Sequence, residues 1–144
     1  MIKSNLSELT KLIEKKKKVL IVSHYSPDGD ALGSSFALYN FLKSINIDSY
    51  VYNQDPVPEY LSFLSINDFT NTIDLLPKDL DLVIVLDLND LERAGKDMMA
   101  YIKNEFIQKD KDLIVIDHHE NNKIDYGTHL LIQMHVLLES FCTD

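Results

Sequence analysis

The chain has 144 residues, 45% of them hydrophobic, and a formal net charge of −9 at pH 7. This length predicts one domain with enough apolar material for a core, and the acidic balance argues against a broad basic surface for nucleic acid. No apolar run approaches the ~18 residues of a membrane span, and no signal peptide is evident at the start. With Cys142 as its single cysteine, the chain is expected to be cytoplasmic, with no internal disulfide and no thiolate zinc site.

The first predicted element is an amphipathic helix close to the N-terminus. Ser4 or Asn5 would cap its start, and the lysines at 15–18 would form its solvated end, where positive charge suits the helix dipole. The apolar positions that predict it recur three and four residues apart, at Leu6, Leu9, Leu12 and Ile13.

A β–α–β unit follows this helix. Its strands are predicted at 18–23 and 48–53, and its helix at 29–44. Prolines then interrupt the pattern. A short helix is expected at 59–64, and for residues 65–80 the sequence leaves open one short helix or one short strand.

The second half of the chain alternates in the same way. A continuous apolar strand is predicted at 81–86, as expected for a strand covered on both faces. A helix around 98–106, a strand at 112–117 and a strand-like segment at 128–131 follow. Alternating strands and helices predict an α/β fold with a doubly wound, mainly parallel sheet.

Acids and imidazoles follow three of these strands. The carboxyl ends of parallel strands are where open α/β sheets bind ligands. Imidazole and carboxylate together suit a divalent ion such as Mn²⁺, with Mg²⁺ as an alternative, and a pair of ions can promote phosphoryl displacement. The candidate residues are His24, Asp28 and Asp30 after the first strand, Asp87 after the second, and Asp117, His118 and His119 after the third.

Each candidate also has a plainer interpretation. An isolated acid after a strand usually caps the next helix, so Asp28 or Asp30 alone would suggest capping. Their coincidence with His24 and with two further strand ends favours metal ligation. Asp87 is preferred to Asp90 because it directly follows the apolar strand.

Four neighbouring residues are weaker candidates. Tyr25 flanks the metal candidates and would offer one aromatic face to a base. Backbone amides near Gly33 would suit a phosphate, although helix packing explains this glycine equally well. Arg93 and His129 are interpreted as structural.

The pattern His24-x-x-x-Asp28-x-Asp30 with Gly33-Ser34, then Asp87, then Asp117-His118-His119 resembles the DHH phosphoesterase superfamily, over about residues 5–131. Within it, the chain is most similar to bacterial oligoribonucleases that also dephosphorylate 3′-phosphoadenosine 5′-phosphate. The resemblance implies that His24 and Asp28 hold one ion, that Asp30 and His118 hold the other, and that Asp87 bridges them. Asp117 and His119 would orient His118 or contact the phosphate.

The same resemblance predicts how the chain is divided. Residues 1–131 correspond to an incomplete DHH domain, without the later aspartate and the C-terminal substrate domain of the family, and we expect reduced activity. Residues 132–144 depart from the family pattern, which suggests a shifted reading frame or a cloning artefact.

Several functional alternatives remain open. A non-catalytic metal- or nucleotide-binding fragment is the main alternative to a phosphoesterase of short oligonucleotides. Cyclic-dinucleotide phosphodiesterases and RecJ-type exonucleases share these motifs, whereas the Asn-Pro-Asp-Thr-Asp form of the pyrophosphatases is missing. Assembly as a homodimer also stays open.

Overall fold

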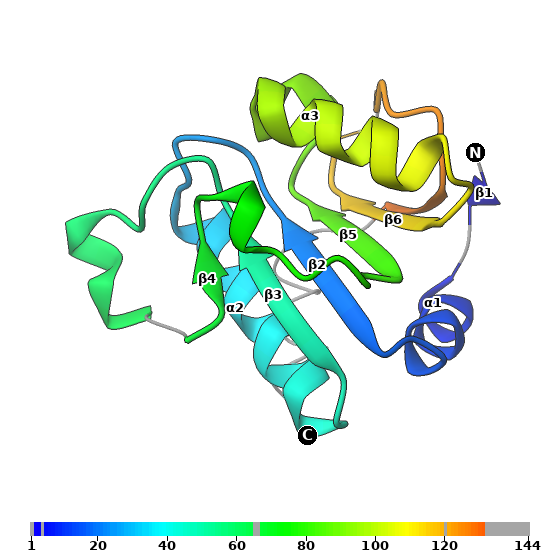
Figure 1. The fold of residues 1–144 in the computed structure, drawn as a ribbon, viewed down its shortest axis with the longest axis horizontal. Coiled ribbons are helices and arrows are strands. Elements are labelled where there is room, and N and C mark those ends of the chain that lie inside the picture. The colour runs from blue at the N-terminus through cyan, green and yellow to red at the C-terminus, as the bar shows by residue number, and fades with distance from the viewer. Residues whose placement is uncertain (1, 4, 65–66, 120, 132–144) are drawn as a thin grey trace.

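The computed structural model of the chain describes residues 2–3, 5–64, 67–119 and 121–131, and it contains one parallel sheet (Figure 1). The seven strands pair in the order β1-β7-β6-β5-β2-β3-β4, and each neighbouring pair is parallel. This confirms the predicted α/β fold. The strands are β1 Ile2–Lys3, β2 Lys18–Val22, β3 Asp48–Tyr52, β4 Phe69–Thr70, β5 Leu82–Leu86, β6 Asp112–Asp117 and β7 Thr128–Leu131.

Within the described residues, three α-helices and four short helical turns connect these strands. The turns are of 3₁₀ type except η4, a π-helical turn that directly continues α3. No helix in the described ranges is both long and apolar enough to cross a membrane. The helices are α1 Leu6–Glu14, α2 Gly29–Ser44 and α3 Lys96–Ile102, and the turns are η1 Glu59–Leu64, η2 Ile73–Leu75, η3 Leu91–Ala94 and η4 Lys103–Ile107.

The start of the chain follows the sequence prediction with one correction. Asn5 caps α1 through a capping box with Glu8, which satisfies free N–H groups of the first turn. The helix ends at Glu14, earlier than the lysine run suggested, and Lys18 already belongs to β2. The carboxylate of Asp81 accepts hydrogen bonds from the backbone N–H groups of residues 17 and 18, and this fixes the amino end of β2 beside β5.

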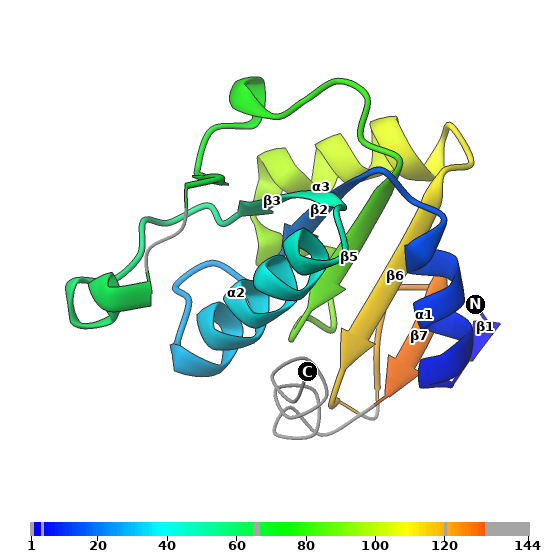
Figure 2. The same ribbon diagram turned by 90° about the horizontal axis from the view of Figure 1, so that it is seen from below.

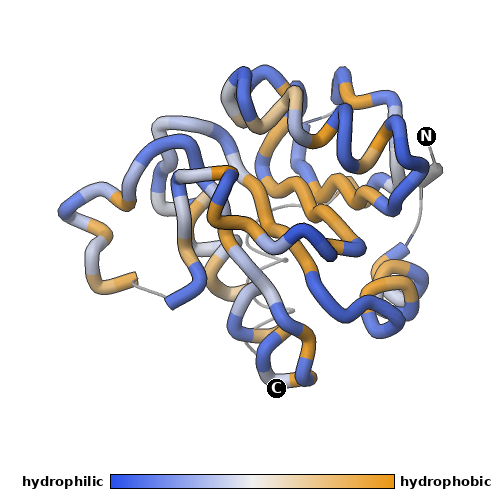
Figure 3. Tube along the Cα trace, viewed as in Figure 1, coloured by the Kyte–Doolittle hydropathy of each residue, from blue (hydrophilic) through white to orange (hydrophobic). Residues whose placement is uncertain are grey.

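The sheet has a separate hydrophobic core on each face. Successive residues of a strand point to opposite faces, so Ile84 packs with α1 and α2 while Val83 and Val85 pack with α3. Figure 2 shows α3 on the opposite side of the sheet from α1 and α2, and Figure 3 shows hydrophobic residues along the central strands. Burial on both faces explains why β5 is apolar throughout.

The strand order brings together the three strands with polar ends. β5 lies between β2 and β6 at the centre of the sheet. The chain proceeds from β2 to β3 and β4 in one direction, and from β5 to β6 and β7 in the other. The boundary between β2 and β5 is therefore the topological switch point, where folds of this kind bind ligands.

Candidate metal centre

The loop after β2 is held in place by side chains that follow β3. Asn53 is fully buried, and its Nδ2 donates to Ser23 Oγ at 3.0 Å and to the backbone oxygen of His24 at 2.7 Å. The carboxylate of Asp55 accepts from the backbone N–H of Ser26 at 2.6 Å. These contacts fix the backbone on both sides of His24.

The backbone also sets the orientation of the His24 ring. Its Nδ1 lies 2.7 Å from the carbonyl oxygen of Tyr25 and therefore donates to it. The other nitrogen, Nε2, lies 3.4 Å from Asp87 Oδ2 and 3.8 Å from Asp28 Oδ1. This arrangement leaves Nε2 facing two carboxylates, as expected for a metal-ligating histidine whose second nitrogen is anchored.

The two acids at the start of α2 differ in position. Asp28 is the N-cap of the helix, and its Oδ1 accepts from the backbone N–H of Ala31 at 2.9 Å. It also belongs to a group with His24 and Asp87 whose potential ligand atoms lie within 4.8 Å of one another. Capping and metal ligation are therefore compatible here. Asp30 is exposed on the first turn of α2 and does not belong to this group.

Asp87 is buried between the ends of β2 and β6. Its φ of 54° is in the left-handed region, which Asp tolerates better than most residues, and its backbone N–H donates to Ile116 O at 3.1 Å. Its Oδ2 faces His24, and its Oδ1 lies 2.9 Å from His118 Nε2. The carboxylate thus links two imidazoles from the strands on either side.

The residues after β6 form a second group around Asp87. His119 Nδ1 lies 2.6 Å from Asp117 Oδ1, so that Asp117 contacts His119 while His118 contacts Asp87. Asn122 Nδ2 donates to the other oxygen of Asp117 at 3.1 Å. Asp87, Asp117, His118 and His119 all offer a potential ligand atom within 4.8 Å of one another.

The charges at this edge influence one another. The contact with Asp87 raises the pKa of His24 above its ordinary value, although burial opposes this. Burial alone would raise the pKa of Asp87, but the contacts and charges of His24 and His118 outweigh burial and hold it below its ordinary value. Without a metal, His24 and Asp87 therefore favour an imidazolium–carboxylate pair.

These residues have the composition of a binuclear metal site. Carboxylate and imidazole suit Mn²⁺, and carboxylate also suits Mg²⁺. Asp87 belongs to both groups of potential ligands, which is the arrangement required of a carboxylate that bridges two ions. The donor set thus fits the ions expected from the sequence.

Sequence reasoning did not single out the residues that support this site. Asn53 and Asp55 follow the carboxyl end of β3, as His24 follows β2. Their position after a parallel strand could have marked them as neighbours of the site. Asn122 lies in an irregular segment, where no pattern marked it. Asp90, the rejected alternative to Asp87, caps η3 by accepting from the backbone N–H of Glu92, and His129 is buried in β7.

The doubly wound parallel sheet, with acids and imidazoles at its switch point, defines the class: an α/β protein with a candidate metal centre. A family model described as the N-terminal domain of the DHH family matches residues 18–142. The chain therefore belongs to the DHH family.

The similar proteins include two bacterial enzymes and one solved structure. The chain is 30% identical over 118 residues to the bifunctional oligoribonuclease and PAP phosphatase of Thermus thermophilus, with 81% of this chain and 32% of that protein covered. It is 31% identical over 122 residues to the enzyme of the same description from Mycoplasma genitalium, with 84% and 36% covered. The chain spans about a third of the length of these relatives.

A structure of an exopolyphosphatase-related protein from Bacteroides fragilis shares the fold. It has a TM-score of 0.78 and 28% identity, over 95% of this chain and 42% of that chain. The family match includes most of residues 132–144, which lie outside the described residues, so the hypothesis of a shifted frame stays a prediction.

Proposed function

We propose that the chain carries the metal centre of a phosphoesterase that hydrolyses phosphodiester or phosphomonoester bonds with two divalent ions, with Mn²⁺ as the expected metal. The observation that carries this proposal is the position of Asp87, buried directly after the central strand β5 and common to both groups of potential ligands. A two-metal hydrolase needs such a shared carboxylate, because the ions must lie close enough to act on one phosphoryl group.

The residues divide between the two groups. His24 and Asp28 would hold one ion, and His118 would hold the other together with Asp30, whose side chain would have to turn toward the site. Asp117 fixes the ring of His119, which would face the phosphate. Divalent ions in such a site supply a water nucleophile near neutral pH and offset the charge of the phosphate.

The substrate class follows from the relatives. Both bacterial relatives are described as an oligoribonuclease and a PAP phosphatase. We therefore propose short oligoribonucleotides or 3′-phosphoadenosine 5′-phosphate as substrates. We further propose residues 1–131 as the DHH domain. A non-catalytic metal- or nucleotide-binding module is the second candidate, because the matched region is only about a third of those enzymes.

Hydrolysis of a diribonucleotide, with and without Mn²⁺, tests the proposal. We expect Mn²⁺-dependent turnover that Asp87→Asn abolishes, and two manganese peaks beside Asp87 in anomalous scattering from a soaked crystal. Two ions without turnover would favour the binding module. Turnover that survives Asp87→Asn, or the absence of any ion beside Asp87, would contradict the two-metal assignment.

A further inference from the structure

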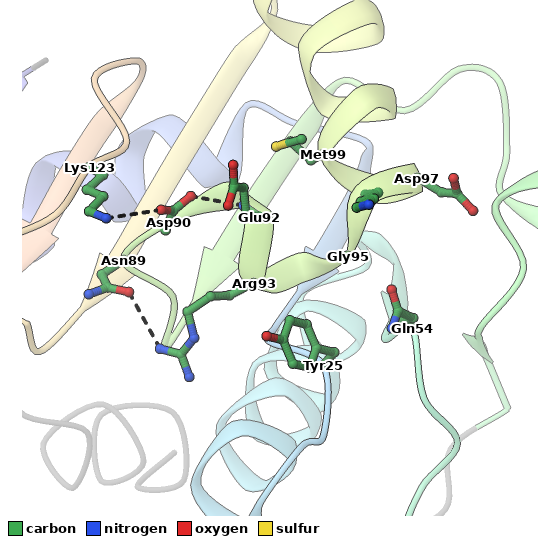
Figure 4. Close-up of a pocket in the computed structure, with 11 residues that line it drawn as sticks. Tyr25, Gln54, Asn89, Asp90, Glu92, Arg93, Gly95, Asp97, Met99 and Lys123 are labelled. Carbon is green, nitrogen blue, oxygen red and sulfur yellow. Dashed lines mark hydrogen bonds and ion pairs between the residues drawn. The ribbon is translucent and has the colours of Figure 1, made fainter.

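A pocket of about 930 Å³ opens on the α3 face of the sheet (Figure 4). Several separate segments line it: Tyr25 after β2, Gln54 after β3, most residues from Asn89 to Gly95 after β5, the beginning of α3, and Lys123. Its volume lies within the range of ~300–1,000 Å³ that is typical of small-molecule sites. The pocket is large enough for one organic ligand.

The pocket continues the same segments that carry the metal candidates. Tyr25 directly follows His24, and Asn89 lies two residues after Asp87. Consecutive Cα atoms are ~3.8 Å apart, so this wall of the pocket begins within one or two residue lengths of the candidate ligands. The pocket is therefore near enough for a substrate with its phosphate at the metal centre to place its neighbouring group in this space.

The charges around the pocket disfavour a phosphate as its occupant. Three acids line it, Asp90, Glu92 and Asp97, and three bases, Arg93, Lys96 and Lys123. Two of these charges already face each other, because Lys123 Nζ lies 3.6 Å from Asp90 Oδ2. A lining with both signs in equal number suits a neutral polar ligand better than an anion.

The remaining lining residues offer stacking and hydrogen bonds. The side chain of Tyr25 is 45% exposed, and the thioether of Met99 adds an apolar surface. Gln54 and Asn89 carry amides, which both donate and accept. An aromatic face with amides is the chemistry that proteins use for unpaired bases.

We propose that this pocket receives the nucleoside next to the scissile phosphate, with its base stacked on Tyr25. The inference rests on the proposed function for the identity of the substrate. Arg93 is held at the wall of the pocket: its backbone oxygen accepts from the N–H of Tyr25 at 2.7 Å, and its Nη1 lies 3.5 Å from Asn89 Oδ1. This guanidinium would meet the phosphate that links the nucleoside to the metal centre.

Binding to the metal-free 144-residue chain tests the pocket without any hydrolysis. Adenosine 5′-monophosphate and ribose 5-phosphate are titrated separately into ¹⁵N-labelled protein, and the amide shifts are followed by NMR. We expect the nucleotide to shift the amides of Tyr25, Gln54 and Met99, and the sugar phosphate, which lacks a base, to bind much more weakly. Equal binding of both compounds, or shifts outside the pocket only, would overturn the inference.

Substitutions at the aromatic face sharpen the test. Stacking on one aromatic side chain contributes enough that Tyr25→Ala should weaken nucleotide binding roughly 5- to 150-fold, whereas Tyr25→Phe should retain it. Tyr60→Ala is the matched control, because Tyr60 is 71% exposed and lies away from this pocket. Unchanged affinity in Tyr25→Ala would contradict stacking at this site.

The two proposals fail in different ways. If the nucleotide binds with the expected dependence on Tyr25 but Mn²⁺ produces no turnover, the hydrolase assignment is wrong and the nucleoside site stands. If a diribonucleotide is hydrolysed with the same KM by wild type and Tyr25→Ala, the hydrolase assignment stands and the nucleoside site is wrong.

Discussion

Aspartates lie at both ends of the parallel strands, but their surroundings differ between the two ends. At the amino end, Asp79 pairs with Lys18 Nζ at 2.7 Å, and Asp112 pairs with Lys16. Asp81 accepts from two backbone N–H groups at 3.0 Å each. The acids at this end are thus paired with cations or amides supplied by the chain itself.

Three acids at the carboxyl end have different partners. The ion pairs of Asp28, Asp87 and Asp117 within the described ranges are with histidines only. Asp87 and Asp117 are also buried. Burying a carboxylate is unfavourable unless it is paired or coordinates a metal.

This difference separates structural acids from functional ones. A lysine is permanently charged near neutral pH and satisfies an acid at the surface, whereas an imidazole can lose its proton and become a ligand. The carboxyl end therefore has groups that can receive a cation from solution, and the amino end does not need one.

Exchanging one acid at each end should give the largest contrast. Asp87→Asn removes the shared carboxylate, while Asn still tolerates the positive φ at this position. We expect its affinity for Mn²⁺, measured by calorimetry, to fall by more than about 100-fold, since even partners outside the ligand shell account for ~10- to 100-fold. Asp112→Asn should bind Mn²⁺ as wild type does, and equal losses in both variants would remove the distinction between the ends.

The buried support of His24 should matter next. Asn53→Ala removes two hydrogen bonds that fix the loop after β2, so we expect a ~10- to 100-fold loss of Mn²⁺ affinity and a stability loss of about 1–3 kcal/mol. Ser49→Ala is the control, because Ser49 is buried on the same strand but bonds the backbone of Tyr39, in α2. If both variants change stability and neither changes affinity, Asn53 is only structural.

Mn²⁺ affinity should also depend on pH. The pKa of His24 is raised, and a metal must displace its proton, so below that pKa affinity should fall by about tenfold per pH unit. His129→Gln should keep this profile, because burial lowers the pKa of that histidine and it lies outside the site. A flat profile between pH 5 and about 8 would exclude His24 as a ligand.

The stability of the metal-free chain should vary in the opposite direction. The contribution of His24 is complete below its ordinary pKa of 6.5 and is lost as pH rises through its higher folded value. The contribution of Asp87 is complete above its ordinary pKa of 3.8 and is lost as pH falls through its lower folded value. In urea unfolding, this pair should therefore stabilise the chain most between pH 3.8 and pH 6.5. Asp87→Asn should remove the contribution of this pair to the pH dependence of stability.

The smallest effect is expected at the amino end. Lys16→Met removes the ion pair with Asp112, whose side chain is 50% exposed. Such pairs contribute less than about 1 kcal/mol, and salt screens them. We expect a small loss of unfolding free energy, measured with urea at low salt, and unchanged Mn²⁺ binding. A larger loss of unfolding free energy would mean that the amino end is more than a set of surface ion pairs.

Much of the fold was predictable because it depends on local patterns. The apolar run of β5 and the extent of α2 follow from periodicity and caps. The two-residue strands β1 and β4 were not predicted, since such short segments have no period to detect. The polar stretch 65–80 contains β4 and η2, which pair and pack through distant partners.

The sequence by itself determined which residue types follow each strand, and hence that carboxylates and imidazoles would occur at one edge of a parallel sheet. Only the tertiary structure decided that Asp87 faces both His24 and His118, that Asn53 supports the loop after β2, and that Tyr25 lines a pocket. Hydrophobic periodicity records which face of an element is buried, but the order of strands depends on how whole helices pack across the sheet. The distances between side chains at the ends of β2, β5 and β6 are therefore set by this packing and cannot be derived from local sequence patterns.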